Sequence, residues 1–399
     1  MNTQESLAAV SRFIQDHRDE VVNFASRLVQ TRSVNPPGDE REIAEMVSQE
    51  FTRLGLTPKI LDHGENYRSV IASVGPHTQR PAVILNGHLD TVPPGEVAWE
   101  RSPFSGTVED GFLYGRGASD MKAGDAAMTY AAAALASLGE DALQGQLRLT
   151  LTSSEETISK GAKAVAQSDL VKGAGVVLIA EPTNLDIYTA EKGCFWITVT
   201  ARGKTAHGSM PHCGVNAVQG LTDFLWKLRS YWHNLAEIPH PNLGPSTASV
   251  NVISGGVGTN VIPDLATANV DIRTIPGQTH EELLKKMNMW AQELSEKHPG
   301  LSIDITILND RAPYEIAQDH NAVISMATSI ERATGKSPER KAVAFYTDAS
   351  IFGPTCGLPV VIFGPGDPTL AHQPNERAST ISIVQAAESI ALWATGLLS

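Results

Sequence analysis

Four short runs of apolar residues, separated by helical segments, constrain the fold of this chain more than any other feature. They are AVILNG (82–87), LRLTLT (147–152), VVLIAE (176–181) and PVVIFG (359–364). Strands that read as continuous apolar runs are buried on both faces, which is typical of largely parallel sheets covered by helices. Between the first two runs, residues 121–139 form an alanine-rich pattern that predicts a helix closed by glycine. The sequence therefore predicts an α/β domain.

Two amphipathic helices are predicted before the first run, over 18–30 and 40–56, because each places its apolar side chains on one stripe. The first 20 residues lack the basic and apolar regions of a signal peptide. No apolar run reaches the length of a membrane span, so we expect no contact with a membrane.

The segment 191–311 has a different pattern. Its strand-like and helical stretches are, in chain order, 195–203, 215–230, 247–254, 266–274, 279–298 and 301–308. The order β-α-β-β-α-β is that of a ferredoxin-like sandwich. In the second helix, Thr279 is expected to be the N-cap, with Glu282 completing a capping box. We therefore predict one α/β domain from 1–190 and 312–399, with an α+β domain inserted over 191–311.

Composition excludes several classes of protein. The chain has 399 residues and a formal net charge of −13, which argues against nucleic acid as a partner. Three widely spaced cysteines, Cys194, Cys213 and Cys356, predict neither a disulfide framework nor a thiolate zinc site, and they fit a cytoplasmic protein.

Histidines and carboxylates follow the ends of all four apolar runs. They are His88 and Asp90, then Glu155 and Glu156, then Glu181, then His372, with Asp120 just before the alanine-rich helix. Each has an ordinary explanation alone: Asp120 as a helix cap, the glutamate pair as surface charge, His372 as a solvated loop residue. Ligands of open α/β sheets, however, bind at the carboxyl ends of the strands. Imidazoles and carboxylates without thiolates suit a two-metal hydrolytic site.

The ordered motifs GHLDTVP, GRGASDMKAG, SSEE, EPT, GKTAHGSMPHCGVNA and AHQPNE resemble those of the M20 family of metallopeptidases and deacylases. That family includes acetylornithine deacetylase, succinyl-diaminopimelate desuccinylase, aminoacylases and glutamate carboxypeptidases. The resemblance spans residues 18–376. It implies a zinc-peptidase-like α/β catalytic domain with an inserted ferredoxin-like domain that serves as a lid and for dimerisation.

The resemblance also implies a role for each metal-site residue. His88 and Glu181 would bind one Zn²⁺, Glu156 and His372 the other, and Asp120 would bridge them; Co²⁺ or Mn²⁺ are possible substitutes. The metals would hold a bridging hydroxide and polarise the scissile carbonyl.

Three further features come from the same resemblance. Glu155 would be the general base. Asp90 would orient His88, since alternation along an extended chain puts both on one side. The peptide bond between Asp120 and Met121 is typically cis in this family.

In the inserted domain, His207 matches the family histidine that stabilises the oxyanion, usually from the other subunit of a homodimer. Asn260 and Arg273 match residues that contact polar groups of the substrate, and an arginine fork suits a substrate carboxylate. For His212 and His280 an ordinary structural role is preferred.

The leading hypothesis is an amidohydrolase that cleaves a small N-acyl amino acid bearing a free carboxylate, as a deacetylase or desuccinylase does. A carboxypeptidase or dipeptidase and an ammonia-releasing aminohydrolase remain alternatives with the same catalytic residues. Glu181 favours the deacylase branch, whereas TDA at 347–349 resembles carboxypeptidases. Thr157 departs from the glycine that often follows the glutamate pair. A non-catalytic metal-binding member is disfavoured because every catalytic residue is present, and GASDM at 117–121 lacks the final glycine of a serine-hydrolase elbow.

Overall fold

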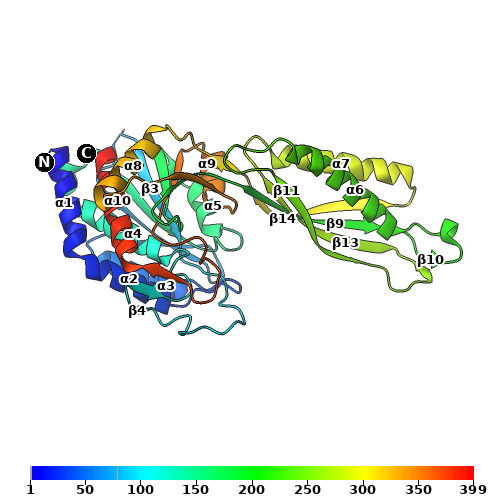
Figure 1. Ribbon diagram of the computed structural model, residues 1–399, viewed down its shortest axis with the longest axis horizontal. Helices are drawn as coiled ribbons and strands as arrows, with labels where there is room; N and C mark the ends of the chain where they lie inside the picture. Colours follow the sequence, from blue (N-terminus) through cyan, green and yellow to red (C-terminus); the bar gives the residue numbers. More distant parts are fainter. Residues whose placement is uncertain (1, 79) are drawn as a thin grey trace. The chain divides into compact units, whose positions relative to one another are not determined.

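The computed structural model describes residues 2–78 and 80–399 and divides into two compact units. Unit 1 consists of Met1–Thr189, Ile316–Lys341 and Thr347–Ser399, and unit 2 of Ala190–Glu315 and Ala342–Tyr346. Unit 2 thus extends to Glu315, beyond the expected boundary at 311, and it includes the segment 342–346, which was expected in the α/β domain. Figure 1 shows the elements of both units along the chain.

Unit 1 contains most of the helices. They are α1 (Thr3–Asp16), α2 (Arg18–Gln30), α3 (Arg41–Arg53), α4 (Lys122–Ala136), α5 (Lys160–Ala166), α8 (Asn321–Thr334), α9 (Ala349–Cys356) and α10 (Thr380–Leu398). Its strands are β1 (Lys59–Asp62), β2 (Arg68–Val74), β3 (Ala82–His88), β6 (Leu147–Thr152), β7 (Ala174–Ile179), β17 (Val360–Ile362) and the first part of β8 (Ile187–Glu191). A small separate sheet contains β4 (Thr107–Glu109), β5 (Phe112–Tyr114) and β18 (Arg377–Ser379).

The part of the main sheet that unit 1 contributes has the strand order β1-β2-β6-β3-β7-β17-β8. The four strands predicted from apolar runs are its parallel centre, because β3 pairs in parallel with β6 and β7, and β17 pairs in parallel with β7. Strand β3 is buried along its whole length, as continuous apolar strands in covered parallel sheets are. The predicted α/β class is confirmed.

Helices cover both faces of this sheet, and β3 shows which helix lies on which face. Neighbouring strand residues point to opposite faces. The Asn86 side chain donates a hydrogen bond to Asp348 at the start of α9, so α9 covers one face. The next residue, Gly87, faces α4 on the other side, where a Cβ added to the glycine would lie 2.3 Å from Asp125 Oδ1. Helix α4 also runs so close to the end of β7 that a Cβ at Gly124 would lie 2.1 Å from Ala180 O. Small residues thus bring the start of α4 against the strand ends.

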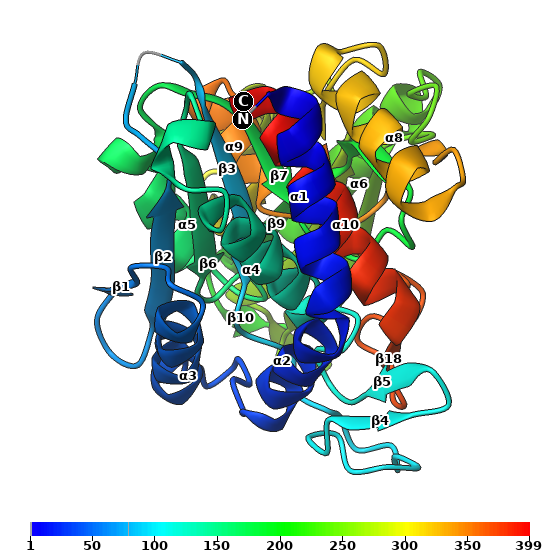
Figure 2. The ribbon, with the colours of Figure 1, turned by 90° about the vertical axis from the view of Figure 1, so that its left-hand side faces the viewer.

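Helix α10 packs against α4, α1 and α8, and Figure 2 shows it beside α1. By length and composition alone, Thr380–Leu398 could cross a membrane, contrary to the expectation that no segment reaches this length. However, 78% of its most apolar 18-residue stretch is buried inside the structure. Helix α10 is a largely buried helix of unit 1.

Unit 2 has the predicted β-α-β-β-α-β order. Its main elements are β9 (Gly193–Arg202), α6 (Ala217–Ala236), β11 (Thr247–Gly255), β13 (Leu265–Thr274), α7 (His280–Lys297) and β14 (Ser302–Arg311). Shorter strands are β10 (Ala206–His207), β12 (Val261–Ile262), β15 (Tyr314–Glu315) and β16 (Arg340–Val343), the last extending from unit 1. The sheet is antiparallel, in the order β11-β13-β9-β14. Thr279 caps α7 by accepting a hydrogen bond from Glu282 N, as predicted, whereas the return bond from the Glu282 side chain that would complete the capping box does not occur among the described residues.

Candidate metal centre

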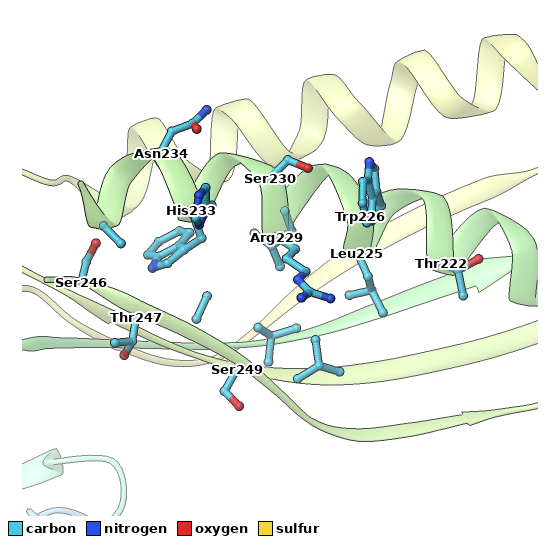
Figure 3. A pocket seen from close by; sticks show the side chains of 16 residues that line it. Thr222, Leu225, Trp226, Arg229, Ser230, His233, Asn234, Ser246, Thr247 and Ser249 are labelled. Carbon is cyan, nitrogen blue, oxygen red and sulfur yellow. The ribbon is translucent and has the colours of Figure 1, made fainter. Parts of the chain in front are cut away.

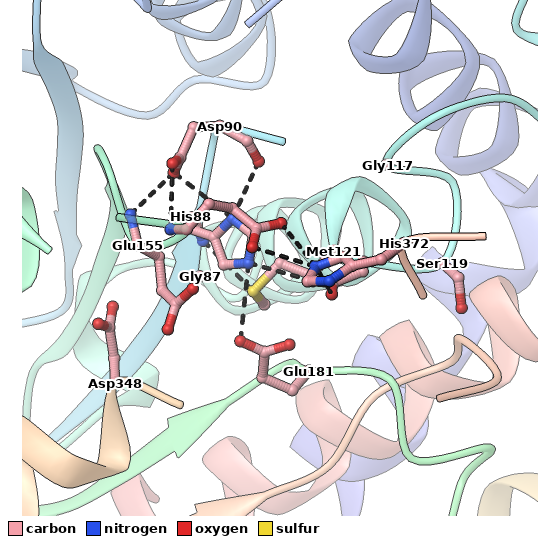
Figure 4. Close-up of polar contacts among 12 residues, drawn as sticks. Gly87, His88, Asp90, Gly117, Ser119, Met121, Glu155, Glu181, Asp348 and His372 are labelled. Atoms are coloured by element: carbon pink, nitrogen blue, oxygen red, sulfur yellow. Dashed lines mark hydrogen bonds and ion pairs between the residues drawn. The ribbon is translucent and has the colours of Figure 1, made fainter. Parts of the chain in front are cut away.

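The candidate centre lies at the carboxyl ends of the parallel strands of unit 1. His88 is the last residue of β3, Glu155 and Glu156 follow β6, Glu181 follows β7, and His372 comes from the loop after β17. Asp120 lies in the turn before α4, and its peptide bond to Met121 is cis, as the resemblance implies. Figure 4 shows His88, Glu155, Glu181 and His372 converging from separate segments.

Asp120 lies between two groups of side chains. His88 Nε2 is 3.2 Å from Asp120 Oδ1 and 3.6 Å from Glu181 Oε1. His372 Nε2 is 3.4 Å from Asp120 Oδ2 and 3.1 Å from Glu156 Oε2. Each carboxylate oxygen of Asp120 therefore faces a different histidine, and each histidine has a second carboxylate beside it.

The donor set fits metal ions on two counts. Ligand atoms of His88, Asp120 and Glu156 all lie within 4.8 Å of one another. Imidazole and carboxylate donors without thiolate are the ligands that Zn²⁺, Co²⁺ and Mn²⁺ accept in hydrolytic sites. The arrangement of Asp120 between two His–Glu pairs suits one bridging and two terminal carboxylates.

The electrostatics show how strongly this cluster attracts positive charge. Hydrogen bonds with Asp120 and Glu156 raise the pKa of His372 to about 10. Burial alone would lower the pKa of His88, but the hydrogen bond with Asp120 and the charge of Glu181 raise it well above its ordinary value. Burial, with the charge of Asp120, raises the pKa of Glu181. Burial also acts to raise the pKa of Asp120, but its hydrogen bonds with His372 and His88 leave it well below the usual range. Protons bound at these histidines would compete with metal ions for the imidazole nitrogens, because a histidine must be neutral to bind a metal.

Asp90 is fully buried and its carboxylate holds the turn after β6. It accepts hydrogen bonds from Glu155 N at 3.0 Å, Glu156 N at 3.2 Å and Asn35 Nδ2 at 3.0 Å. His88 Nδ1 lies 3.0 Å from the backbone carbonyl of Asp90 and 3.6 Å from its carboxylate. The nearer acceptor for the imidazole is thus the backbone, and the carboxylate mainly positions the glutamate pair.

Asn35 explains how threonine is accommodated at position 157. Its side-chain amide donates to the Asp90 carboxylate and, at 3.0 Å, to Thr157 Oγ1. The hydroxyl that departs from the family pattern is therefore bonded into the turn. Sequence reasoning did not single out Asn35.

Glu376 is the main residue of the site that sequence reasoning missed, although it ends the AHQPNE motif. It is fully buried and accepts hydrogen bonds from the backbone N–H groups of Ser119 at 2.8 Å, Asp120 at 2.9 Å and Gly117 at 3.1 Å. The same carboxylate pairs with the buried Arg116 guanidinium. Glu376 therefore fixes the turn that presents Asp120.

We expect Glu376→Ala to destabilise the protein by about 3–5 kcal/mol, because it leaves the Arg116 charge buried without its partner. Thermal unfolding of the variant, compared with the exposed α8 substitution Glu331→Ala, measures the effect. A melting temperature equal to that of the control would show that Glu376 does not hold this turn.

The three predicted residues of unit 2 do not lie together. His207 and Asn260 are exposed neighbours, because β10 pairs with β12 and Gly208 N donates to Asn260 O. Arg273 lies next to the last residue of β13. The opposite end of this strand begins at Leu265, which pairs with Arg202. At about 3.3 Å per residue, the two ends of β13 are roughly 30 Å apart. His212 is exposed in a short helical turn, and His280 is buried between Thr274 and Asp310.

Comparison with known proteins gives a consistent result. A protein named probable succinyl-diaminopimelate desuccinylase from Staphylococcus epidermidis is 30% identical over 364 residues, covering 84% of this chain and 88% of the relative. An M20 family metallo-carboxypeptidase from Sulfolobus solfataricus superposes with a TM-score of 0.76 at 18% identity, covering 94% and 98% of the two chains. A dinuclear metal-binding M20 peptidase from Bacillus subtilis superposes with a TM-score of 0.73 at 16% identity, covering 96% and 99%. Residues 84–395 match the model of peptidase family M20/M25/M40, and the chain therefore belongs to that family and is a hydrolase of amide or peptide bonds.

Proposed function

We propose that this protein is a dinuclear zinc amidohydrolase that removes the acyl group from a small N-acyl amino acid. The observation that carries the proposal is the position of Asp120, with one oxygen facing His88 and the other facing His372. In this assignment His88, Glu181 and Asp120 hold one metal, and His372, Glu156 and Asp120 hold the other. When bound, the two ions would polarise the scissile carbonyl and acidify the attacking water.

Glu155 is assigned as the general base. It precedes the ligand Glu156, and the Asp90 carboxylate fixes the backbone N–H groups of both. Its carboxylate would take the proton from the attacking water and deliver it to the nitrogen of the leaving amine. Burial of Glu155, whose exposed fraction is 6%, restricts the solvent around that proton.

The identity of the acyl group is tested by a hydrolysis screen of the zinc-loaded protein. The panel contains N-acetyl, N-succinyl and N-formyl amino acids beside matched dipeptides and folate-type glutamates, with release of amine and ammonia measured separately. The proposal predicts the highest kcat/KM for an acyl amino acid. A preference for dipeptides or C-terminal glutamates would assign the protein to the peptidase branch, and release of ammonia would indicate an aminohydrolase.

We also propose that the protein is a homodimer joined through unit 2. Strand β11 is the edge of its sheet and carries exposed apolar side chains, among them Val252 at 56% and Ile253 at 59%. Beside it, an open groove of about 1050 Å³ lies between α6 and β11, with Trp226 and Arg229 in its wall (Figure 3). An unpaired apolar edge strand is a surface for pairing with a second chain.

The three free cysteines fit a reducing cytoplasm.

In a dimer, the exposed His207 could act on the catalytic centre of the other subunit. We propose that His207 and Asn260, at the opposite end of the unit 2 sheet from Arg273, serve the catalytic centre of the partner. A mixed dimer of His207→Ala and Glu155→Ala chains then contains one centre with both residues intact. We expect it to recover a fraction of wild-type activity, whereas each parent homodimer stays inactive. Failure to recover activity on mixing would show that His207 acts within its own chain.

A further inference from the structure

His372 has less support from the rest of unit 1 than His88 has. Its side chain is 50% exposed, compared with 2% for His88. His88 Nδ1 lies 3.0 Å from the Asp90 carbonyl, whereas neither Nδ1 nor the backbone N–H and C=O of His372 has a hydrogen-bond partner among residues 2–78 and 80–399. A histidine that binds a metal is normally oriented by a hydrogen bond at its second ring nitrogen. The orientation of His372 therefore depends on the residues that flank it.

The segment 363–376, between β17 and β18, carries this histidine, and we call it the His372 loop. His372 and Asn375 both have a left-handed backbone, with φ of 62° and 61°. Residues other than glycine adopt this conformation at a cost in energy, and they keep it where surrounding contacts hold it. One such contact is present, because the Asn375 side chain accepts a hydrogen bond from Glu100 N at 2.8 Å. The loop is thus held from another segment of unit 1.

Arg116 connects the same two segments a second time. Its Nη1 donates to the carbonyl of Gln373, the residue after His372, at 3.3 Å, and its Nη2 donates to Pro93 O at 3.4 Å. The guanidinium carbon lies 5.2 Å from the ring centroid of Trp99. An aromatic ring at this distance attracts a guanidinium and limits its movement. The hydrogen bond that holds the backbone beside His372 is therefore supported by Trp99.

Trp99 also shapes the segment from which the loop is held. Its indole N–H donates to Pro94 O at 3.0 Å, which closes residues 94–99 into a compact turn. The next residue is Glu100, whose N–H binds Asn375. One half-buried side chain thus supports both contacts to the His372 loop, by its ring at Arg116 and by its N–H within the turn.

We propose that Trp99 is a positioning residue that holds the His372 loop and thereby sets the zinc affinity of the half of the centre formed by Glu156 and His372. The inference rests on the proposed dinuclear centre and adds to it a residue that binds no metal. The half formed by His88 and Glu181 should depend little on Trp99, because His88 is buried at the end of β3 and has its own partner in the Asp90 carbonyl.

The test measures zinc affinity in two chains that each keep one half of the centre. Glu181→Ala keeps the half that contains His372, and His372→Ala keeps the half that contains His88. Adding Trp99→Ala should weaken zinc binding about tenfold in the Glu181→Ala chain and less than threefold in the His372→Ala chain, since outer partners of a metal ligand typically contribute 10–100-fold. Competition with a chromogenic chelator gives both affinities without any measurement of turnover.

Two further variants serve as controls in the Glu181→Ala chain. Trp99→Phe keeps a ring beside the Arg116 guanidinium, so most of the affinity lost in Trp99→Ala should return. Val97→Ala changes a 66% exposed side chain of the same segment and should leave the affinity unchanged.

Two results would overturn the inference alone. An unchanged zinc affinity in Glu181→Ala on adding Trp99→Ala would show that the loop is held without Trp99. Equal losses in the two chains would show that Trp99 stabilises unit 1 in general. If neither single-site chain binds zinc, the proposed dinuclear centre fails and the inference fails with it. A wild type that binds two zinc ions but cleaves no amide would refute the proposed activity and leave the role of Trp99 standing.

Discussion

Glu155→Gln is expected to lower kcat by about 10²–10⁴-fold while the protein still binds both metal ions. Positioned proton transfer contributes a factor of this size, and glutamine keeps the shape of the side chain but cannot accept the proton. Because Glu155 is not assigned as a ligand, its replacement should leave the donor set around Asp120 intact. Steady-state kinetics on the best substrate, with metal content measured on the same sample, check the prediction.

The matched comparison for that variant is Glu156→Gln, which changes the neighbouring carboxylate. It should lower the metal content as well as the activity, because Glu156 Oε2 faces His372 at 3.1 Å. If Glu155→Gln retains activity within tenfold of wild type, the general base is another residue. If Glu155→Gln loses metal and Glu156→Gln does not, the two roles are interchanged.

Asp120→Ala is expected to have the second large effect, abolishing binding of both metals and with it the activity. Among the residues that the structure describes, Asp120 is the one carboxylate that contacts both histidines of the centre. Asp90→Asn provides the graded comparison, because Asp90 lies behind the ligands and bonds the turn that carries Glu155 and Glu156. Loss of such an outer partner typically costs 10–100-fold in metal affinity or activity.

Metal titrations of both variants would separate these effects. We expect a measurable but weaker affinity in Asp90→Asn and none in Asp120→Ala. Thermal unfolding should follow the same order, since a metal that binds only the folded protein stabilises it by mass action. Tight binding of one metal by Asp120→Ala would show that the two sites form independently, contrary to a shared carboxylate.

The parallel core of the fold could be predicted because its signal is local. Continuous apolar runs identify strands buried on both faces, and all four predicted strands occur in the sheet as β3, β6, β7 and β17. The βαββαβ order of unit 2 was also visible, since alternation and helical periodicity change at clear points. These patterns depend on which faces of an element are buried, and the sequence records that directly.

Other elements were missed for identifiable reasons. Helix α1 begins the chain with a capping box between Asn2 and Glu5, a signal that was present and not used. The hairpin of β4 and β5 turns at Asp110–Gly111, both with positive φ, which is typical of a two-residue hairpin loop. Its strands have three residues each, too few for alternation to identify them.

The sequence predicted the residues of the candidate site that follow the ends of strands and have side chains able to bind a metal. It did not predict the residues whose role depends on contacts between distant parts of the chain. His88 and Glu156 converge because they follow the parallel strands β3 and β6, and Asp120 joins them from the turn before α4. The bond from Glu376 to the Asp120 turn joins residues 256 positions apart. No local pattern predicts such a contact, and none predicts that the side-chain nitrogens of Arg311 lie buried without a hydrogen-bond acceptor among the described residues.

Inductively coupled plasma mass spectrometry of zinc-loaded, dialysed protein would show whether the centre holds two metal ions that share Asp120. We expect two zinc ions per chain in the wild type, one in Glu181→Ala, one in His372→Ala and none in Asp120→Ala. A wild-type chain that binds one ion or none, or an Asp120→Ala chain that still binds two, would contradict a dinuclear centre shared through Asp120.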